Sequence, residues 1–190
     1  MTRLDQQGVT LTELVVALAI VMITAAIGIP MYVSNIPHQR LKAAGQDLIT
    51  NLRLARGKAV ATNQPYLVCF DTSTQSYRLA PEAGAVLACN SVEKTIGLND
   101  SYAGVAFGVG SIGTPCPEAL STNPIGFPGN AARFSSRGAS VDNSSAIVTS
   151  AAVYLTNTRD PQRETYCVQV EGTTGRSRLW RWDVNAGLWK

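Results

Sequence analysis

The first third of the chain carries two hydrophobic patterns in succession. Residues 14–36 contain no charged side chain, and the apolar stretch 14–33 is long enough to cross a hydrocarbon layer of about 30 Å as a helix. From residue 37 onward, apolar residues recur every three or four positions, as on a helix with one face against a core. They are Leu41, Ala44, Leu48, Leu52, Ala55 and Ala59. The two patterns predict one long helix over residues 9–61.

Three residues inside this helix predict bends. Gly28 and Pro30 interrupt the apolar stretch, and Pro37 stands where the second pattern begins. A proline removes a backbone donor and crowds the preceding turn, so we predict that the helix is kinked at these positions.

After Pro65 the pattern changes to that of short strands. Residues 66–70 and 77–79 flank a polar stretch, which predicts a hairpin, and within 165–171 Tyr166, Val168 and Val170 share one face. Residues 108–130 are rich in Gly, Pro, Ser and Thr and predict a long surface loop. The remaining expected strands are 85–89, 91–96, 105–107, 146–156 and 176–182. The predicted fold class is α+β, with the long helix packed on an antiparallel sheet.

A single carboxylate, Glu13, stands at the head of the uncharged stretch. An ionised side chain at the rim of a membrane span is costly to bury, which makes Glu13 a candidate functional residue. An ordinary cleaved signal peptide is disfavoured because the head is too polar and the apolar stretch too long.

Gly8, Glu13 and the uncharged run together resemble the prepilin signature of type IV pilins and type II secretion pseudopilins. The resemblance implies that a prepilin peptidase cuts between Gly8 and Val9 and that Val9 is then methylated. It also implies that Glu13 pairs with the terminal amine of a neighbouring subunit during assembly. Val9 replaces the usual Phe, and Thr12 stands where Ile is common.

Residues 54–65, with the sequence LARGKAVATNQP, look like the FimT/GspH branch of minor pilins. Residues 132–138 resemble the F-x-x-x-G strand and turn of the same branch. Gly57, Lys58 and Thr62 depart from the usual residues of this branch. The resemblance implies a pilin fold with four segments. They are a leader over 1–8, a transmembrane and assembly half-helix over 9–36, an amphipathic half-helix over 37–62, and a β-rich domain over 63–190.

Four cysteines behind a membrane-targeting head suggest disulfides in a domain outside the cytoplasm. Four cysteines allow three pairings, and the spacing does not choose among them. We favour Cys89 with Cys116, which would clasp the long loop, and Cys69 with Cys167 between strands.

The tail over residues 175–190 gathers arginines and all three tryptophans of the chain. In an extended conformation Arg176, Arg178, Trp180 and Trp182 would share a face. The GRxR sequence resembles a DNA-binding motif of FimT-type pilins, which implies DNA contacts by Arg176 and Arg178. We add the nearby Arg181 as a further candidate. The alternative is a purely structural terminal strand, as in GspH-like pseudopilins.

Catalytic chemistry has no support in the sequence. The chain has one histidine, His38, expected on a solvated helix face near Arg40, and no Cys/His cluster with metal-ligand spacing. The net charge of +3 does not by itself imply nucleic acid. We expect no enzyme activity, no cofactor and no metal.

The resemblance therefore predicts a minor type IV pilin that primes or caps pilus assembly, with DNA as a possible ligand. Its expected partners are other pilins, the prepilin peptidase and the inner-membrane assembly platform. Before assembly it would span the inner membrane once with its C-terminal domain in the periplasm, and afterwards stand in the extracellular pilus. Two alternatives stay open: a GspH-type minor pseudopilin of type II secretion, and a membrane-anchored domain unrelated to filaments.

Overall fold

The computed structural model describes residues 10–82, 89–119, 121–161 and 164–190, with the backbone alone at residues 30 and 31. The chain divides into two compact units, the first ending at Ile36 and the second running Pro37–Lys190. The proposed leader, Gly8 and Val9 lie outside the described residues.

The predicted long helix is confirmed as α1 (Leu11–Thr62), apart from residue 9, which is not described. It ends because Asn63 takes the left-handed conformation, with φ of 53°, that commonly closes helices. Helical backbone continues through Gly28, Pro30 and Pro37, so none of them ends the helix. The kink at these residues stays a prediction.

The amphipathic half of α1 packs as predicted. The six apolar residues that recur from residue 41 to residue 59 are all at most 1% exposed. They belong to one hydrophobic core that also contains Val68 and Phe70 from one sheet and Val153 and Val168 from another. The buried face of the helix thus joins both sheets into a single folded unit.

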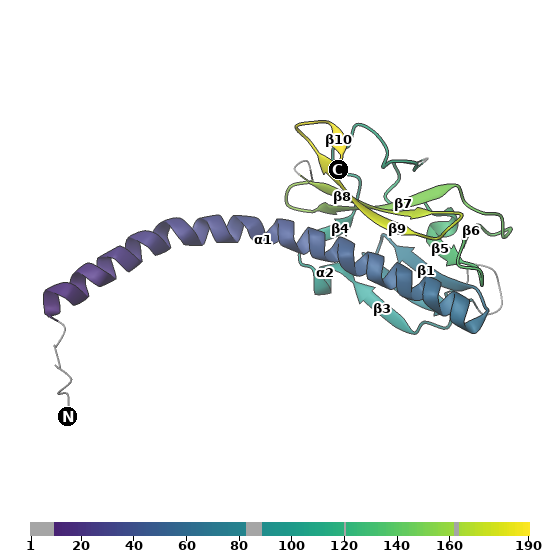
Figure 1. Ribbon diagram of the computed structural model, residues 1–190, viewed down its shortest axis with the longest axis horizontal. Helices are drawn as coiled ribbons and strands as arrows, with labels where there is room; N and C mark the ends of the chain where they lie inside the picture. The colour runs from purple at the N-terminus through teal and green to yellow at the C-terminus, as the bar shows by residue number, and fades with distance from the viewer. Residues whose placement is uncertain (1–9, 83–88, 120, 162–163) are drawn as a thin grey trace, which may run out of the picture. The chain divides into compact units, whose positions relative to one another are not determined.

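The described residues form two five-stranded sheets, in which neighbouring strands are antiparallel (Figure 1). The first sheet has the order β3-β2-β1-β5-β6 and the second the order β10-β9-β8-β7-β4. The strands of the first are β1 (Tyr66–Asp71), β2 (Ser76–Pro81), β3 (Lys94–Gly97), β5 (Ala131–Phe134) and β6 (Ser140–Val141). Those of the second are β4 (Val105–Phe107), β7 (Ser150–Asn157), β8 (Thr165–Glu171), β9 (Ser177–Asp183) and β10 (Leu188–Trp189). Helices α2 (Leu98–Ser101) and η1 (Pro128–Asn130) are short connections.

The antiparallel strands are confirmed, but they form two sheets where the sequence analysis expected one. The hairpin of β1 and β2 and the strands β4, β7, β8 and β9 lie where predicted to within a few residues. Strands β6 and β10 were not predicted, because two residues are too few to show an alternation. Residues 85–88 of one expected strand lie outside the described residues, and Cys89 is not in a strand.

A buried polar network fixes α1 against the first sheet. The Tyr77 hydroxyl donates to Asp47 Oδ2 at 2.8 Å and accepts from Asn51 Nδ2 at 3.0 Å. Burial first, and then the nearby Asp47 carboxylate, raises the pKa of Tyr77, so the phenol keeps its proton and remains a donor. Because buried polar groups are costly without partners, this network sets one register of helix on sheet.

The favoured disulfide pairing was wrong. The structure joins Cys69 to Cys89 and Cys116 to Cys167. In β1 the side chains of Cys69 and Leu67 point to the face opposite the core residue Val68. In β8 the side chain of Cys167 points to the face opposite the core residue Val168. The two strand cysteines therefore lie on the outer faces of different sheets and cannot meet, so each pairs with a loop cysteine.

Tethering of the loop over residues 108–130 is confirmed, although by a different partner. The Cys116–Cys167 bond fixes it to β8, and Tyr154 Oη donates to the Ser121 carbonyl at 2.8 Å. Trp189 Nε1 donates to the Thr114 carbonyl at 3.1 Å. The part of the loop around Cys116 therefore lies against the outer face of the second sheet, whereas Ile125 and Phe127 are buried in the main hydrophobic core.

Three sequence patterns that carry the family resemblance meet at one point. Arg56 of LARGKA donates through Nε to the carbonyl of Gly138, the glycine of F-x-x-x-G, at 3.1 Å. Gly175, the glycine of GRxR, has φ of 64°, and a Cβ there would overlap the same Gly138 oxygen. A side chain at Gly175 is therefore excluded by contact as well as by backbone conformation.

The disulfide assignment predicts two linked peptides after proteolysis without reduction. Mass spectrometry of the full chain should find Cys69 linked to Cys89 and Cys116 linked to Cys167, because each pair lies on one sheet face. A peptide that links Cys69 to Cys167 would contradict the assignment of these strands to separate sheets.

The contact at Gly175 predicts different costs for two glycines of the same conformation. Gly187 has φ of 63°, and a Cβ there would have no atom within 4 Å other than those of its two chain neighbours. Gly187→Ala should therefore lower the free energy of unfolding by about 1–2 kcal/mol from left-handed strain alone. Gly175→Ala should cost about 1–3 kcal/mol more, since its methyl group meets the Gly138 carbonyl. Urea unfolding of the full chain in detergent measures both, and equal losses would disprove the contact.

Candidate functional site

The described part of α1 begins with a capping box formed by Thr10 and Glu13. The Glu13 amide donates to Thr10 Oγ1 at 3.3 Å, and the Thr10 amide donates to Glu13 Oε2 at 3.2 Å. Thr10 Oγ1 also donates to Glu13 Oε2 at 3.1 Å. The carboxylate thus satisfies a backbone donor that the start of a helix leaves without a partner. The sequence analysis missed this role, although Thr-x-x-Glu is its signature.

Glu13 remains available to a second partner. Its side chain is exposed, and a carboxylate has four lone-pair positions, of which the capping contacts occupy only some. A cationic group approaching from outside could therefore bind the same carboxylate. The cleavage between Gly8 and Val9 and the methylation of Val9 stay predictions, since neither residue is described.

The apolar residues that follow Glu13 are exposed along the first unit. Leu14, Ile20 and Ile27 are 55%, 57% and 72% exposed. Helix α1 is long and apolar enough to cross a membrane, and none of its most apolar window is buried in the protein. This helix half is therefore not the core helix of a folded domain, and lipid or other apolar helices would cover it.

The C-terminal strand β9 carries the predicted basic residues. The register with β8 sets Arg178 opposite Gln169 and Trp180 opposite Cys167, on the outer face of the sheet. Trp180 Nε1 donates to Gln169 Oε1 at 2.7 Å, and the rings of Trp182 and Trp189 lie 5.2 Å apart. The predicted common face is confirmed, but its tryptophans pack within the protein.

Arg181 does not join Arg176 and Arg178. By the alternation of the strand its side chain lies on the opposite face, opposite Tyr166, beside a cavity that Glu164 and Asp183 also line. Burial raises the pKa of Tyr166, and the nearby Arg181 opposes that shift. Arg181 therefore does not share a face with the two other arginines, since it is an odd number of residues from both, and its contact with DNA stays a prediction.

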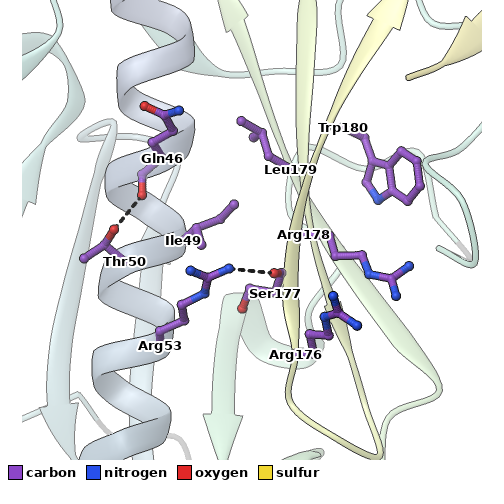
Figure 2. Close-up of a pocket in the computed structure, with 9 residues that line it drawn as sticks. All are labelled: Gln46, Ile49, Thr50, Arg53, Arg176, Ser177, Arg178, Leu179 and Trp180. Carbon is purple, nitrogen blue, oxygen red and sulfur yellow. Dashed lines mark hydrogen bonds between the residues drawn. The ribbon is translucent and has the colours of Figure 1, made fainter.

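A groove of about 530 Å³ runs between α1 and β9 (Figure 2). We call it the β9 groove. Figure 2 shows Arg53 on the helix side and Arg176 and Arg178 on the far side of β9. Its lining residues are Gln46, Ile49, Thr50, Arg53, Arg176, Ser177, Arg178, Leu179 and Trp180. The lining carries three arginines and no carboxylate. The sequence could not predict that Arg53 joins the other two, because that depends on where β9 lies in the fold.

Two carboxylates stand close to the same arginines outside the groove. Glu118 and Glu171 line a small cavity with Arg176 and Arg178 on the outer face of the second sheet. They partly offset the positive charge on that face, which weakens the attraction for a long polyanion.

His38 lies elsewhere than expected. It is half-buried, and its Nδ1 lies 2.5 Å from Glu164 Oε2, so it contacts the start of β8 rather than solvent. Among the residues that the structure describes, no group of three His, Cys, Asp or Glu side chains could hold a metal ion.

Comparison with known proteins adds the family. Residues 44–174 match the family described as type II transport protein GspH, and residues 3–29 match the prokaryotic N-terminal methylation motif. Among solved structures, the chain is similar to the minor pseudopilin EpsH of the Vibrio cholerae type 2 secretion system. The identity is 16% and the TM-score 0.46, over 74% of this chain and 95% of that one.

A second similar structure is the type IV minor pilin FimU of Pseudomonas aeruginosa, with 14% identity and a TM-score of 0.39, over 80% of this chain and 88% of that one. No curated protein matches the sequence. Because the GspH match covers more than half of the chain and follows a methylation motif, this protein belongs to the GspH family of the type IV minor pilin and pseudopilin superfamily.

Proposed function

We propose that this chain is a minor filament subunit that primes or caps assembly, in a type IV pilus or in the pseudopilus of a type II secretion system. The observation that carries the proposal is an exposed apolar helix half with one carboxylate, Glu13, at its head. Packing of this helix against those of other subunits would remove its apolar surface from lipid without exposing it to water. The role is structural rather than enzymatic.

The registering step is a pairing of charges. An unpaired carboxylate within hydrocarbon costs about 2.5–3.5 kcal/mol, and a neighbouring subunit's terminal amine would remove that cost. The amine arises only when the leader is cut after Gly8. Cleavage by the prepilin peptidase would therefore prepare the chain for assembly through the inner-membrane platform.

The proposed location before assembly is a single span of the inner membrane with the second unit in the periplasm. The two disulfides support it, since such bonds persist in oxidising compartments. After assembly the subunit would stand in a filament. An anchored domain unrelated to filaments no longer fits, because the chain belongs to the GspH family.

DNA binding through Arg176 and Arg178 stays a prediction. Both side chains are exposed, which favours it. The indole of Trp180 is held in place by Gln169, and Glu118 and Glu171 lie beside the arginines and offset part of their charge. An electrostatic contact with phosphate would therefore be weak and strongly dependent on salt.

The processing step predicts the amino terminus of the mature protein. Intact-mass analysis of the protein from its native membranes should find a chain that begins at Val9 and carries one added methyl group. Gly8→Ala should leave the leader in place. A native protein that begins at Met1 would contradict the assembly mechanism.

The pairing of charges predicts that Glu13→Gln impairs assembly while keeping the helix start. Glutamine can still form a capping box with Thr10, so the variant removes the charge and keeps the cap. Incorporation into sheared filaments, measured by immunoblot, should fall roughly tenfold or more because the neighbouring amine loses its anion.

The matched control is Thr10→Ala, which removes the cap and keeps the charge. It should weaken the helix start by about 1 kcal/mol and leave incorporation near that of the unchanged protein. The opposite order, with Thr10→Ala defective and Glu13→Gln normal, would show that Glu13 acts only as a cap.

A further inference from the structure

One edge of the second sheet is open beside the β9 groove. Strand β8 pairs with β9 from Ser177 to Arg181, whereas β10 pairs with β9 only at Trp182 and Asp183. No other described strand pairs with β9. The stretch from Ser177 to Trp180 therefore has a strand neighbour on one side and the groove on the other (Figure 2).

The backbone of this edge is oriented for a further strand. Arg181 exchanges two hydrogen bonds of 2.8 and 2.9 Å with Lys190, on the side away from β8. By the alternation of an antiparallel ladder, the amide and carbonyl groups of Leu179 and Ser177 point the same way, into the groove. The Ser177 carbonyl receives only a long contact of 3.5 Å from Arg53 Nη2.

A buried hydroxyl in the groove also lacks a partner. Ser177 is 2% exposed, and its Oγ makes no hydrogen bond within the described part of the chain. Buried polar atoms without partners are uncommon in folded proteins, and those beside an open edge can be satisfied by whatever occupies it.

The side chains around the edge specify the occupant. A strand added in the plane of the sheet would turn alternate side chains to its two faces. On one face they would meet Arg176 and Arg178, which have Glu118 and Glu171 beside them on the side of β8. On the other face they would meet Ile49 and Leu179, with Arg53 at one end. Opposite charges across neighbouring strands stabilise a sheet, so acidic residues two positions apart with an apolar residue between them fit this edge.

We propose that the β9 groove binds an extended acidic segment of a different filament subunit, which adds to the second sheet as a strand beside β9. Its backbone pairs with Leu179 and Ser177, its carboxylates pair with Arg176 and Arg178, and its apolar residues cover Leu179. The proposal rests on the filament role proposed above, because it names a partner within that filament.

A second copy of this chain does not supply such a segment. None of its 13 acidic residues lies two positions from another. Nucleic acid fits less well, because phosphate oxygens can accept from the edge amides of Ser177 and Leu179 but offer no donor to the edge carbonyls. The segment therefore belongs to another protein.

The test uses the purified full chain in detergent and a short fluorescent peptide in which Glu and Val alternate. Fluorescence anisotropy should show saturable binding, weakened roughly tenfold by Arg176→Gln with Arg178→Gln, since two cross-strand pairs are lost. Arg137→Gln with Arg159→Gln removes the same charge from exposed sites outside the groove and should leave binding unchanged.

A second peptide separates strand addition from simple charge attraction. N-methylation of every other peptide amide, on the side that would face β9, keeps all carboxylates and removes the ladder donors, so binding should be lost. Equal binding of both peptides, equal effects of the two double variants, or no binding would overturn the proposal. So would tighter, arginine-dependent binding of a single-stranded oligonucleotide.

These outcomes do not depend on filament assembly. Failure of peptide binding with normal effects of Glu13→Gln on incorporation would remove the groove proposal alone. Normal incorporation of Glu13→Gln would instead count against the filament mechanism, whatever the peptide does.

Discussion

Burial of one face of the second half of α1 is the interaction on which the folded unit depends. Leu48 and Leu52 are fully buried against residues from both sheets, and the sheets share no strand. At about 25 cal/mol per Å² of apolar surface, each buried leucine contributes about 1.5–3 kcal/mol, and the helix supplies several. Without this face, the residues of both sheets that pack on the helix would be exposed. The polar contacts of Tyr77 then select one register among those that apolar burial alone would allow.

The same helix has a first half whose apolar residues have no partner within the chain. The difference lies in the sequence pattern, since residues 14–33 are apolar all round while those beyond residue 37 are apolar on one side only. A helix of the first kind is covered by lipid or by other helices. The exposed apolar surface needs other helices or lipid to cover it, and membership of the GspH family is consistent with that need.

The sequence predicted well whatever depends on periodicity within one element. The six buried residues of α1, the hairpin of β1 and β2, and the alternation of Val168 with Cys167 all follow from local spacing. It failed where the outcome depends on which strands become neighbours. The disulfide pairing could be predicted only by knowing that Cys69 and Cys167 lie on different sheets. The β9 groove exists because β10 ends at Trp189, and no sequence pattern marks that end.

The arginines on β9 have two physical explanations, which are compatible. Charged side chains on an open edge keep unwanted strands from pairing with it and so prevent aggregation. Such protection is selective when all the charges have one sign, because Arg176 and Arg178 repel basic segments and attract acidic ones. Glu118 and Glu171, on the outer face of the same sheet, limit how far this field extends. On the proposed interpretation, such an edge disfavours pairing with a basic or uncharged strand and favours a strand that brings its own carboxylates in register.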